Sequence, residues 1–331
     1  MILGLDVGGA NTKAVSSDGL FAIIEYLPLW REAPLEPLLR RISAEAKPEA
    51  LAVVMTGELA DCFSNKRSGI LSIKGAVERS FSCPIRFWGV DGFRWTEIGD
   101  LAAANWSASA TLVSEEVGDS IFVDMGSTTT DLIPIKNGPK AGRTDFQRLA
   151  NGELIYSGLL RTNLAFLLQE VEIGGRKVPL SSELFAIAAD AHLVLGEIAE
   201  GDYTVEAPDG GGKDRLSAKR RLARTVCADI EEIGSEGVIE IARQARSRQE
   251  RLLKDGICRI ADRHSLDLVV AAGIGEVLIE EAARSLGLEC VRLSQRYEKS
   301  VSDVFPAYAV ARLLEAEGVS PRNRGRGRGL R

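Results

Sequence analysis

Cysteine and histidine, the residues that bind zinc or form disulfide bridges, are scarce in this sequence. Five cysteines are spread along 331 residues without a C-x-x-C pair, and the two histidines are His192 and His264. A zinc site needs closely spaced ligands and a disulfide framework needs paired cysteines, so the sequence favours neither. Scattered free thiols are typical of a reducing compartment, and we therefore expect a cytoplasmic protein.

Long apolar runs and an excess of positive charge are also lacking. No run approaches the roughly 18 apolar residues of a membrane-spanning helix, and no charged and apolar leader precedes the first predicted strand, so no membrane association is expected. The net charge is −6, from 41 basic and 47 acidic residues. Without an overall basic field, no nucleic-acid partner is expected. Hydrophobic residues make up 45% of the chain, enough for a full core, and the length predicts about two domains.

The stretch from Asp124 to Asp131 (DMGSTTTD) combines acids, a glycine and a run of hydroxyls between two apolar segments. The preceding segment 121–123 is typical of a buried strand, and Gly126 permits a tight turn. A carboxylate at the end of a buried strand, beside Gly, Ser and Thr donors, suits a phosphate and its magnesium ion. The donors bind the phosphate oxygens while the acid faces the ion.

The N-terminus repeats this arrangement 118 positions earlier. Asp6 ends an apolar strand, Gly8 and Gly9 supply the turn, and Thr12 and Lys13 belong to a second strand. One Gly-rich hairpin with an Asp is more often an ordinary turn, but two of them favour phosphate binding. We predict that the two loops face each other across a cleft.

The motifs D-x-G-G-x-x-T-K, from Asp6, and D-x-G-S-T-T-x-D, from Asp124, resemble the phosphate loops of the actin/Hsp70/sugar-kinase superfamily, and within it the hydantoinase A/oxoprolinase-like group. The resemblance implies an α/β fold of duplicated actin-like (ribonuclease H-like) βββαβα domains around a central cleft, with an inserted helical segment in the second half. The implied domains are 1–117, completed by a helix at 302–317, and 118–301, with an insertion at about 174–225. Residues 320–331 are expected to be a disordered basic tail, with RNA contact as the alternative.

The hydrophobic pattern predicts the individual elements. In the first half we expect strands at 2–7, 12–17, 21–27, 51–55 and 85–88, and helices at 34–46, 70–81 and 99–113. In the second half, strands at 120–125 and 128–135 are expected to precede a third strand toward Arg143 and a helix after Leu154. Helices at 182–198, 218–263, 277–286 and 302–317 and strands at 266–272 and 289–293 complete the prediction.

Four residues are predicted to be catalytic: Asp6, Lys13, Glu58 and Asp124. Asp6 and Asp124 are the expected partners of Mg²⁺, which takes one or two carboxylates together with phosphate oxygens and water. Lys13 would neutralise a phosphate, and Glu58, just after a strand end, would act as a general base. The predicted phosphate-binding residues are Gly8, Gly9, Asn11, Thr12, Lys13, Gly126, Ser127, Thr128 and Thr129.

Several candidates have a second interpretation. Lys13 also fits an exposed strand lysine, and Glu58, like Asp61, also fits an acid at a helix N-terminus. Asp131 is expected either near the metal ion, outside its direct ligands, or in an ion pair with a neighbouring loop. His192 is expected to be a half-buried structural residue. Residues for which packing, a plain turn or solvation explains the sequence as readily as a ligand role are Asn105, Trp106, Arg143, Arg148, Arg161, Asp190 and the candidate lid 209–212.

Further motifs resemble an archaeal branch of this group that is linked to tetrahydromethanopterin-dependent C1 transfer and includes an enzyme of methanofuran biosynthesis. They are MTGELADCF at 55–63, GELIYSG at 152–158 and RRLAR at 220–224. The resemblance implies a transferase that condenses (5-aminomethyl-furan-3-yl)methyl diphosphate with γ-glutamyltyramine through the phenol oxygen and releases diphosphate. It implies Mg²⁺ as the cofactor and small-molecule substrates with a diphosphate group, and it leaves the oligomeric state open.

Two other classes of function remain. An ATP-dependent small-molecule kinase or a hydantoinase/oxoprolinase-type hydrolase would use Gly273 and Gly275 in a turn on the nucleotide side. The fuller Gly-Gly-x-x-x-Asn pattern of an adenosine grip is absent there, which disfavours this class. A non-catalytic nucleotide-binding protein would bind without turnover and would tolerate Lys13→Ala. In the transferase interpretation, the loops assist diphosphate departure while a carboxylate such as Glu58 or Asp61 accepts the phenol proton.

Overall fold

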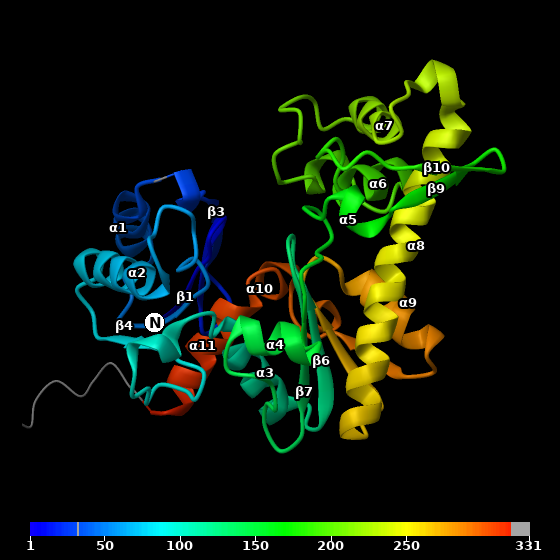
Figure 1. Ribbon diagram of the computed structural model, residues 1–331. Helices are drawn as coiled ribbons and strands as arrows, with labels where there is room; N and C mark the ends of the chain where they lie inside the picture. Colours follow the sequence, from blue (N-terminus) through cyan, green and yellow to red (C-terminus); the bar gives the residue numbers. More distant parts are fainter. Residues whose placement is uncertain (32, 319–331) are drawn as a thin grey trace, which may run out of the picture. The chain divides into compact units, whose positions relative to one another are not determined.

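The computed structural model describes residues 1–31 and 33–318 and divides into two compact units (Figure 1). Unit 1 comprises Met1–Ser120, Ile135–Arg148 and the chain from Leu293 onward. Unit 2 comprises Ile121–Pro134 and Leu149–Arg292. The predicted disordered tail, 320–331, lies outside the described residues.

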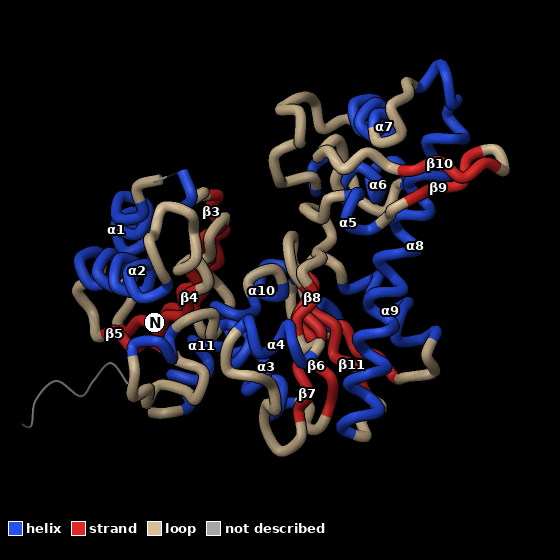
Figure 2. The backbone as a smooth tube through the Cα atoms, in the orientation of Figure 1, coloured by secondary structure: helices blue, strands red, loops and turns tan. Residues whose placement is uncertain are grey.

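Unit 1 is built on a five-stranded sheet in the order β3-β2-β1-β4-β5 (Figure 2). β1 pairs antiparallel with β2 and parallel with β4, and β5 is parallel to β4. The central β1 and β4 are apolar and buried throughout, as expected for strands that are covered on both faces. The strands of unit 1 are β1 Ile2–Val7, β2 Asn11–Ser16, β3 Ala22–Tyr26, β4 Ala50–Met55 and β5 Ile85–Phe87.

Helices cover both faces of this sheet. On one face, Leu3 and Leu5 of β1 share a core with α1 and α2. On the other, Gly4 packs against α11 so closely that a Cβ atom would lie 1.8 Å from the carbonyl oxygen of Ala307. The helices of unit 1 are η1 Leu29–Arg31, α1 Leu35–Ala46, α2 Lys66–Ser80, η2 Ile98–Leu101, α3 Asn105–Glu116, η4 Leu293–Gln295, α10 Lys299–Ser302 and α11 Phe305–Ala316, and α4 Asp145–Asn151 runs across the boundary of the units.

Unit 2 repeats the pattern with a sheet in the order β12-β11-β6-β7-β8. β11 is parallel to both β6 and β12, and β8 is antiparallel to β7. Read from β8, this order matches β3-β2-β1-β4-β5, which confirms the predicted α/β fold of duplicated actin-like units. The strands are β6 Ser120–Met125, β7 Thr130–Ile135, β8 Leu154–Ile155, β11 Leu268–Ala272 and β12 Glu289–Arg292, and a separate hairpin is formed by β9 Glu170–Ile173 and β10 Arg176–Pro179.

A helical segment between β8 and β11 enlarges unit 2. Its longest member, α8, packs against α6, α7 and β9 and, through Gly256, against Leu132 and Ile155 of the sheet. Gly234 has non-helical backbone angles, so α8 contains a kink near its start. The helices of unit 2 are α5 Leu164–Leu167, α6 Ala188–Leu195, η3 Glu200–Asp202, α7 Arg215–Arg224, α8 Ile230–His264 and α9 Glu276–Ser285.

The structure corrects several predicted elements. The third strand of the second sheet is β8, not a strand toward Arg143, because residues 136–144 form only an isolated bridge between Ile135 and Pro139. The helix expected after Leu154 is instead α4, which precedes it. The expected helices at 99–113, 182–198 and 218–263 are shorter or divided, as η2 with α3, as α6, and as α7 with α8. Ala103 and Cys227, which both have a positive φ, interrupt the first and the third of these segments.

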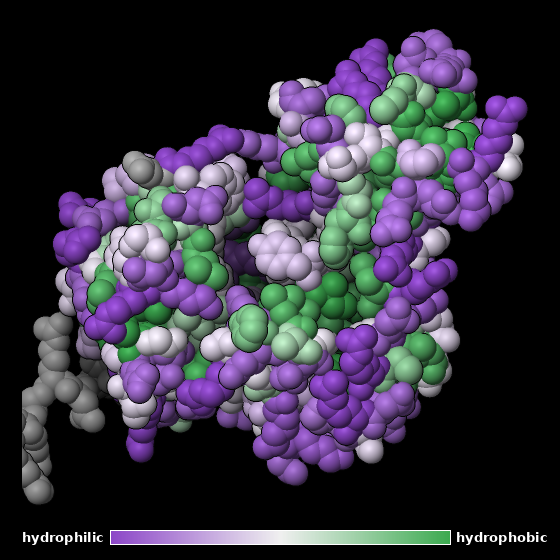
Figure 3. Space-filling model, in the orientation of Figure 1, coloured by the Kyte–Doolittle hydropathy of each residue, from purple (hydrophilic) through white to green (hydrophobic). Residues whose placement is uncertain are grey.

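Hydrophilic residues cover much of the face drawn in Figure 3, with apolar residues scattered among them. Within residues 1–31 and 33–318, no helix combines the length and apolar character needed to cross a membrane.

Candidate active site

Both predicted phosphate loops are tight turns of the same form. In the first hairpin loop, residues 6–13, the Gly8 amide donates to the Asn11 carbonyl oxygen at 3.0 Å. In the second hairpin loop, residues 124–131, the Gly126 amide donates to the Thr129 carbonyl oxygen at the same 3.0 Å. Each loop follows the central strand of its sheet. The 118-residue repeat in the sequence is therefore also a repeat in the backbone.

Asp6 lies at the buried end of β1 and faces Lys13 across the β1–β2 pair. Its side chain is 5% exposed, and its Oδ1 atom has no hydrogen-bond partner in the part of the chain that the structure describes. Burial raises the pKa of Asp6 to about 6, and the nearby Lys13 charge opposes that rise. A buried acid with an unused oxygen beside a lysine can accept a cation or a hydrogen-bond donor from a ligand.

Thr12 is not brought together with Asp6. Thr12 pairs with Val7, so both side chains lie on the opposite face of the sheet from Asp6 and Lys13. Thr12 is fully buried and its hydroxyl has no partner among the described residues. The equivalent Thr130 donates to the Ser157 carbonyl oxygen at 2.6 Å. The Thr12 hydroxyl is therefore not a donor on the Asp6 face of the sheet, and the Gly8 amide is already bonded to the Asn11 carbonyl oxygen.

The second hairpin loop is supported from behind by residues 158–161. The Leu159 amide donates to the Gly126 carbonyl oxygen at 3.0 Å, and the Arg161 amide donates to that of Ser127 at 2.8 Å. A Cβ atom on Gly158 would lie 2.4 Å from the Thr128 backbone nitrogen. Glycine is thus required where this support meets the loop.

A buried polar chain holds Gly158 in place from helix α8. Gln249 donates through Nε2 to the Gly158 carbonyl oxygen at 2.7 Å and to Ser157 Oγ at 3.2 Å. Its Oε1 lies 2.8 Å from His192 Nε2, and His192 Nδ1 lies 2.5 Å from Glu197 Oε2. Gln249 and His192 are each 1% exposed, so His192 is fully buried rather than half-buried as predicted. The chain links α6 and α8 to the second hairpin loop.

The glycines expected on the nucleotide side of the fold have a packing role within unit 2. A Cβ atom on Gly273 would lie 2.4 Å from Asp124 Oδ1, and one on Gly275 would lie 2.3 Å from Met125 Sδ. The Gly275 amide also donates to the Met125 carbonyl oxygen at 3.1 Å. The end of β11 therefore approaches the end of β6 closely, which explains both glycines without a nucleotide.

Glu58 occupies a turn after β4 and is almost completely buried, with 1% exposure. It is not an acid of a helix N-terminus, because α2 begins only at Lys66. Burial, with a contribution from Asp145, raises its pKa to about 7, although Lys66 and the Ala103 amide favour the charged form. Its Oε2 atom has no hydrogen-bond partner within residues 1–31 and 33–318. A carboxyl group with a pKa near neutrality is suited to accept and return a proton.

Two backbone features hold Glu58 in this position. Gly69 of α2 packs onto it so closely that a Cβ atom would lie 2.1 Å from the Glu58 carbonyl oxygen. Ala103 has a φ of 47°, a left-handed conformation that is costly for a residue with a side chain and is often found at functional sites. Asp61, the alternative base, is exposed.

Other candidates have structural partners. Arg143 binds Asp91 and Asp100 at 2.7 and 3.1 Å. The candidate lid is tethered, because Asp209 binds Arg221 and Arg224, both at 3.1 Å. The remaining pairs are Asp190 with Arg221 at 2.7 Å, Arg148 with Asp145 at 2.7 Å, and Arg148 over the Trp106 ring at 5.0 Å.

The residues present fit a magnesium ion that arrives with a phosphate. The described residues contain no group of three or more His, Cys, Asp or Glu side chains that could hold a metal ion. Mg²⁺ bound to a diphosphate needs only one or two carboxylates, because phosphate oxygens and water complete its shell. Asp6, with its unused oxygen, fits that requirement.

Reasoning from sequence missed the support behind the second hairpin loop. Gly158 stood in the GELIYSG motif, but nothing in the sequence connected it with Gln249, which lies 91 residues further along. Lys66 and Arg67, which line a pocket in unit 1, were missed because two basic residues at the start of a helix are common on protein surfaces.

Comparisons with known proteins show which family the chain resembles. Residues 49–317 match the model of the Hydantoinase/oxoprolinase family. A (4-{4-[2-(γ-L-glutamylamino)ethyl]phenoxymethyl}furan-2-yl)methanamine synthase from Methanocaldococcus jannaschii is 41% identical over 328 residues, 96% of this chain and 98% of that protein. A protein of the same name from Methanococcus vannielii is 36% identical over 214 residues, 63% of this chain and 96% of that protein.

Among solved structures, a ROK family glucokinase from Streptomyces griseus in complex with glucose and AMPPNP aligns with a TM-score of 0.49 at 14% identity, covering 94% of this chain and 98% of that one.

Two units of one strand order, each with a glycine hairpin loop after its central strand, define a duplicated actin-like α/β protein. Within that class, the chain belongs to the hydantoinase/oxoprolinase family.

Proposed function

We propose that this protein is an ether-forming transferase that joins (5-aminomethyl-furan-3-yl)methyl diphosphate to γ-glutamyltyramine and releases diphosphate in methanofuran biosynthesis. The observation that carries the proposal is the 41% identity to the M. jannaschii synthase over nearly the full length of both chains. The name of that relative describes a phenoxymethyl link between a phenol and a furan, which is the ether bond that such a reaction forms.

The reaction balances as a substitution at the methylene carbon. The phenol oxygen forms a bond to this carbon as the bond from the carbon to the diphosphate oxygen breaks, and the phenol proton leaves. The furan ring stabilises the developing positive charge on the methylene, so departure of diphosphate is the step that most needs assistance. An enzyme assists it with donors and cations placed where negative charge develops.

The two hairpin loops supply those groups. Lys13 and the amides of Gly9 and Asn11 in the first hairpin loop would bind the diphosphate, as would the amides and hydroxyls of residues 127–129 in the second. The Gly8 and Gly126 amides close the two turns instead. Mg²⁺ held by Asp6, or by the equivalent Asp124 of the other unit, would supply further charge neutralisation of the leaving group. Because Asp6 is buried with one unused oxygen, its carboxylate is already desolvated for that contact.

Glu58 would accept the phenol proton. A phenol has a pKa of about 10, so a base with a pKa near 7 removes its proton as the new bond forms. The Ala103 amide and Lys66 both stabilise the charged form of Glu58, which keeps the carboxylate available before the proton arrives.

The test is incubation of the purified protein with Mg²⁺ and both substrates, followed by mass spectrometry for the ether and an assay for diphosphate. γ-Glutamyltyramine with ¹⁸O in the phenol should keep the label in the ether, because the bond that breaks lies on the diphosphate side. Product that forms only with ATP, or ATP hydrolysis that depends on a small substrate, would replace the proposal by a kinase or hydrolase function.

A further inference from the structure

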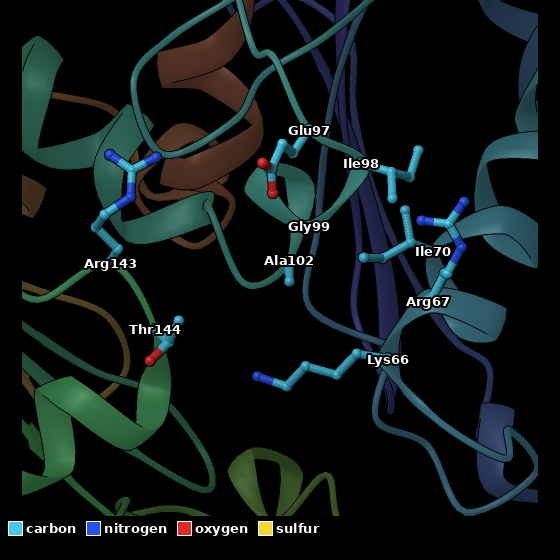
Figure 4. A pocket seen from close by; sticks show the side chains of 9 residues that line it. All are labelled: Lys66, Arg67, Ile70, Glu97, Ile98, Gly99, Ala102, Arg143 and Thr144. Atoms are coloured by element: carbon cyan, nitrogen blue, oxygen red, sulfur yellow. The ribbon is translucent and has the colours of Figure 1, made fainter.

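Unit 1 contains a pocket of about 610 Å³ for which the reaction above has not accounted (Figure 4). It lies between the start of α2, η2 and the segment before α4, and the first hairpin loop is not part of its lining. Its volume falls within the range of about 300–1,000 Å³ that is typical of small-molecule sites. The site is therefore large enough for a substrate and has a lining of its own.

The pocket carries charges that are not neutralised by ion pairs. Lys66 and Arg67 form no ion pair with any other residue that the structure describes, and the same holds for Glu97. Figure 4 shows the Lys66 side chain extending into the pocket, with Glu97 across from it. Arg143 is already committed to Asp91 and Asp100. Two cations and one acid thus remain available to a ligand.

The remaining lining is apolar and leads toward Glu58. Ile70 and Ile98 line the pocket beside these charges. Ala102 also lines it, and the next residue, Ala103, donates its amide to the Glu58 carboxylate. Glu58 therefore lies next to the pocket wall, on the side of Lys66 and Ala103, with one buried oxygen that has no partner among the described residues.

We propose that this pocket binds the amino-acid end of the phenol acceptor, a zwitterion that carries an α-carboxylate and an α-ammonium group. Lys66 binds the carboxylate, and Glu97, across the pocket from it, binds the ammonium group (Figure 4). Arg67, whose side chain extends away from Lys66 in Figure 4, adds positive charge at longer range. The Ile70–Ile98 surface packs against the linker that directs the phenol toward Glu58. The assignment rests on the proposed function, because it divides the acceptor between this pocket and that base. It makes Lys66 and Arg67 specificity-determining residues for the acceptor.

Three acceptors separate the predicted contacts: γ-glutamyltyramine, glutaryltyramine, which lacks the ammonium group, and N-acetyltyramine, which lacks both charges. In the double variant Lys66→Gln/Arg67→Gln, we expect the KM for the first two to rise about 10- to 100-fold, as for loss of hydrogen bonds to a charged group. The KM for N-acetyltyramine and for the diphosphate should stay within about two-fold. Glu97→Gln should raise the KM for γ-glutamyltyramine and leave the KM for glutaryltyramine unchanged.

Lys74→Gln is the matched control, because Lys74 lies on the same helix, outside the pocket, in an ion pair with Glu78. The double variant keeps the Asn65–Ser68 cap of α2, so the helix should still begin at the same residue, which circular dichroism checks. An increase in the KM for the diphosphate alone would overturn the assignment and make the pocket a phosphate site. Equal losses for all three acceptors would also overturn it.

A binding measurement separates failure of this inference from failure of the proposed function. Isothermal titration with γ-glutamyltyramine needs no turnover, so it remains informative if no ether forms. If γ-glutamyltyramine binds to the native chain but not to the double variant, the pocket binds the acceptor even when no ether forms. Equal binding to both chains, or no binding to the native chain, would overturn it.

Discussion

The two hairpin loops share one backbone turn but differ in how they are held and in the charge that they carry. The first has a buried acid, Asp6, with an unused oxygen, and places Lys13 opposite it. At the position equivalent to Lys13, the second has Asp131, and it is supported by Gly158 and the buried chain of Gln249 and His192. In the proposed reaction, the first loop would therefore supply charge and the second a fixed set of donors.

Removal of the acid in the first loop should lower activity strongly, as should replacement of the base Glu58. Asp6→Asn should reduce kcat/KM by about 10²–10³-fold, as does loss of a group that stabilises transition-state charge. Thermal unfolding should show no loss of stability, because the variant buries a neutral group in place of an acid that burial disfavours. Diphosphate release measures the rate. Asp124→Asn, at the equivalent position, provides the comparison, and wild-type rates in both variants would contradict the two-loop site.

Replacement of the base should remove the pH dependence as well as the rate. Glu58→Gln should lower kcat by about 10²–10⁴-fold, the usual contribution of a general base. In the native enzyme, activity should rise with pH and level off above about pH 7, where Glu58 is deprotonated. Asp61→Asn is the control, because Asp61 is exposed nearby. An unchanged pH profile in Glu58→Gln would remove Glu58 from the reaction.

The same variant also tests stability, which should change with pH in the opposite direction to activity. Because burial raises the pKa of Glu58 from 4.5 to about 7, the folded chain keeps a proton that the unfolded chain has released. The free energy of unfolding should therefore fall as pH rises from about 4.5 to 7, and Glu58→Gln should reduce that fall. Urea unfolding at several pH values measures it, with Asp61→Asn expected to follow the native chain.

The opposite charges at equivalent positions give a paired test. Lys13→Ala should raise the KM for the diphosphate about 10-fold, as for loss of one charge-assisted hydrogen bond. Asp131→Ala should not raise it, because no cation is removed. Steady-state kinetics at fixed ionic strength measure both. If Lys13→Ala leaves the KM unchanged, the non-catalytic interpretation of this lysine gains support.

The smallest effect on activity is expected from the support of the second loop. Gln249→Ala should destabilise the fold by about 1–3 kcal/mol, because it leaves buried polar groups unpaired, and should raise the KM for the diphosphate a few-fold. Gln244 is the matched control on the same helix, since it donates to the Glu172 carbonyl oxygen at 2.9 Å. Gln244→Ala should lower stability without changing the KM. If both variants have the same KM for the diphosphate, the buried chain of Gln249 and His192 does not affect how the second loop binds it.

Much of the fold was predictable because its signals are local. Apolar strands that end in Asp-x-Gly occur twice, and each strand, turn and register follows from a few adjacent residues. The short β8 was missed because two residues carry no periodicity. The site was predictable in part, since Asp6, Lys13 and Glu58 lie beside recognisable turns. The contacts of Gly158 with Gln249 and of Glu58 with Ala103 join residues far apart in sequence, so a single sequence could not reveal them.

The contact of Gly4 with Ala307 has a consequence for biosynthesis of the chain. One face of β1 is covered by α11, which follows every other described helix and strand in the chain. Unit 1 therefore cannot complete its hydrophobic core until α11 has been made, whereas every strand of unit 2 and its long helix emerge earlier. A nascent chain that stalls before α11 should expose the Gly4 face of its sheet and depend on chaperones until synthesis resumes.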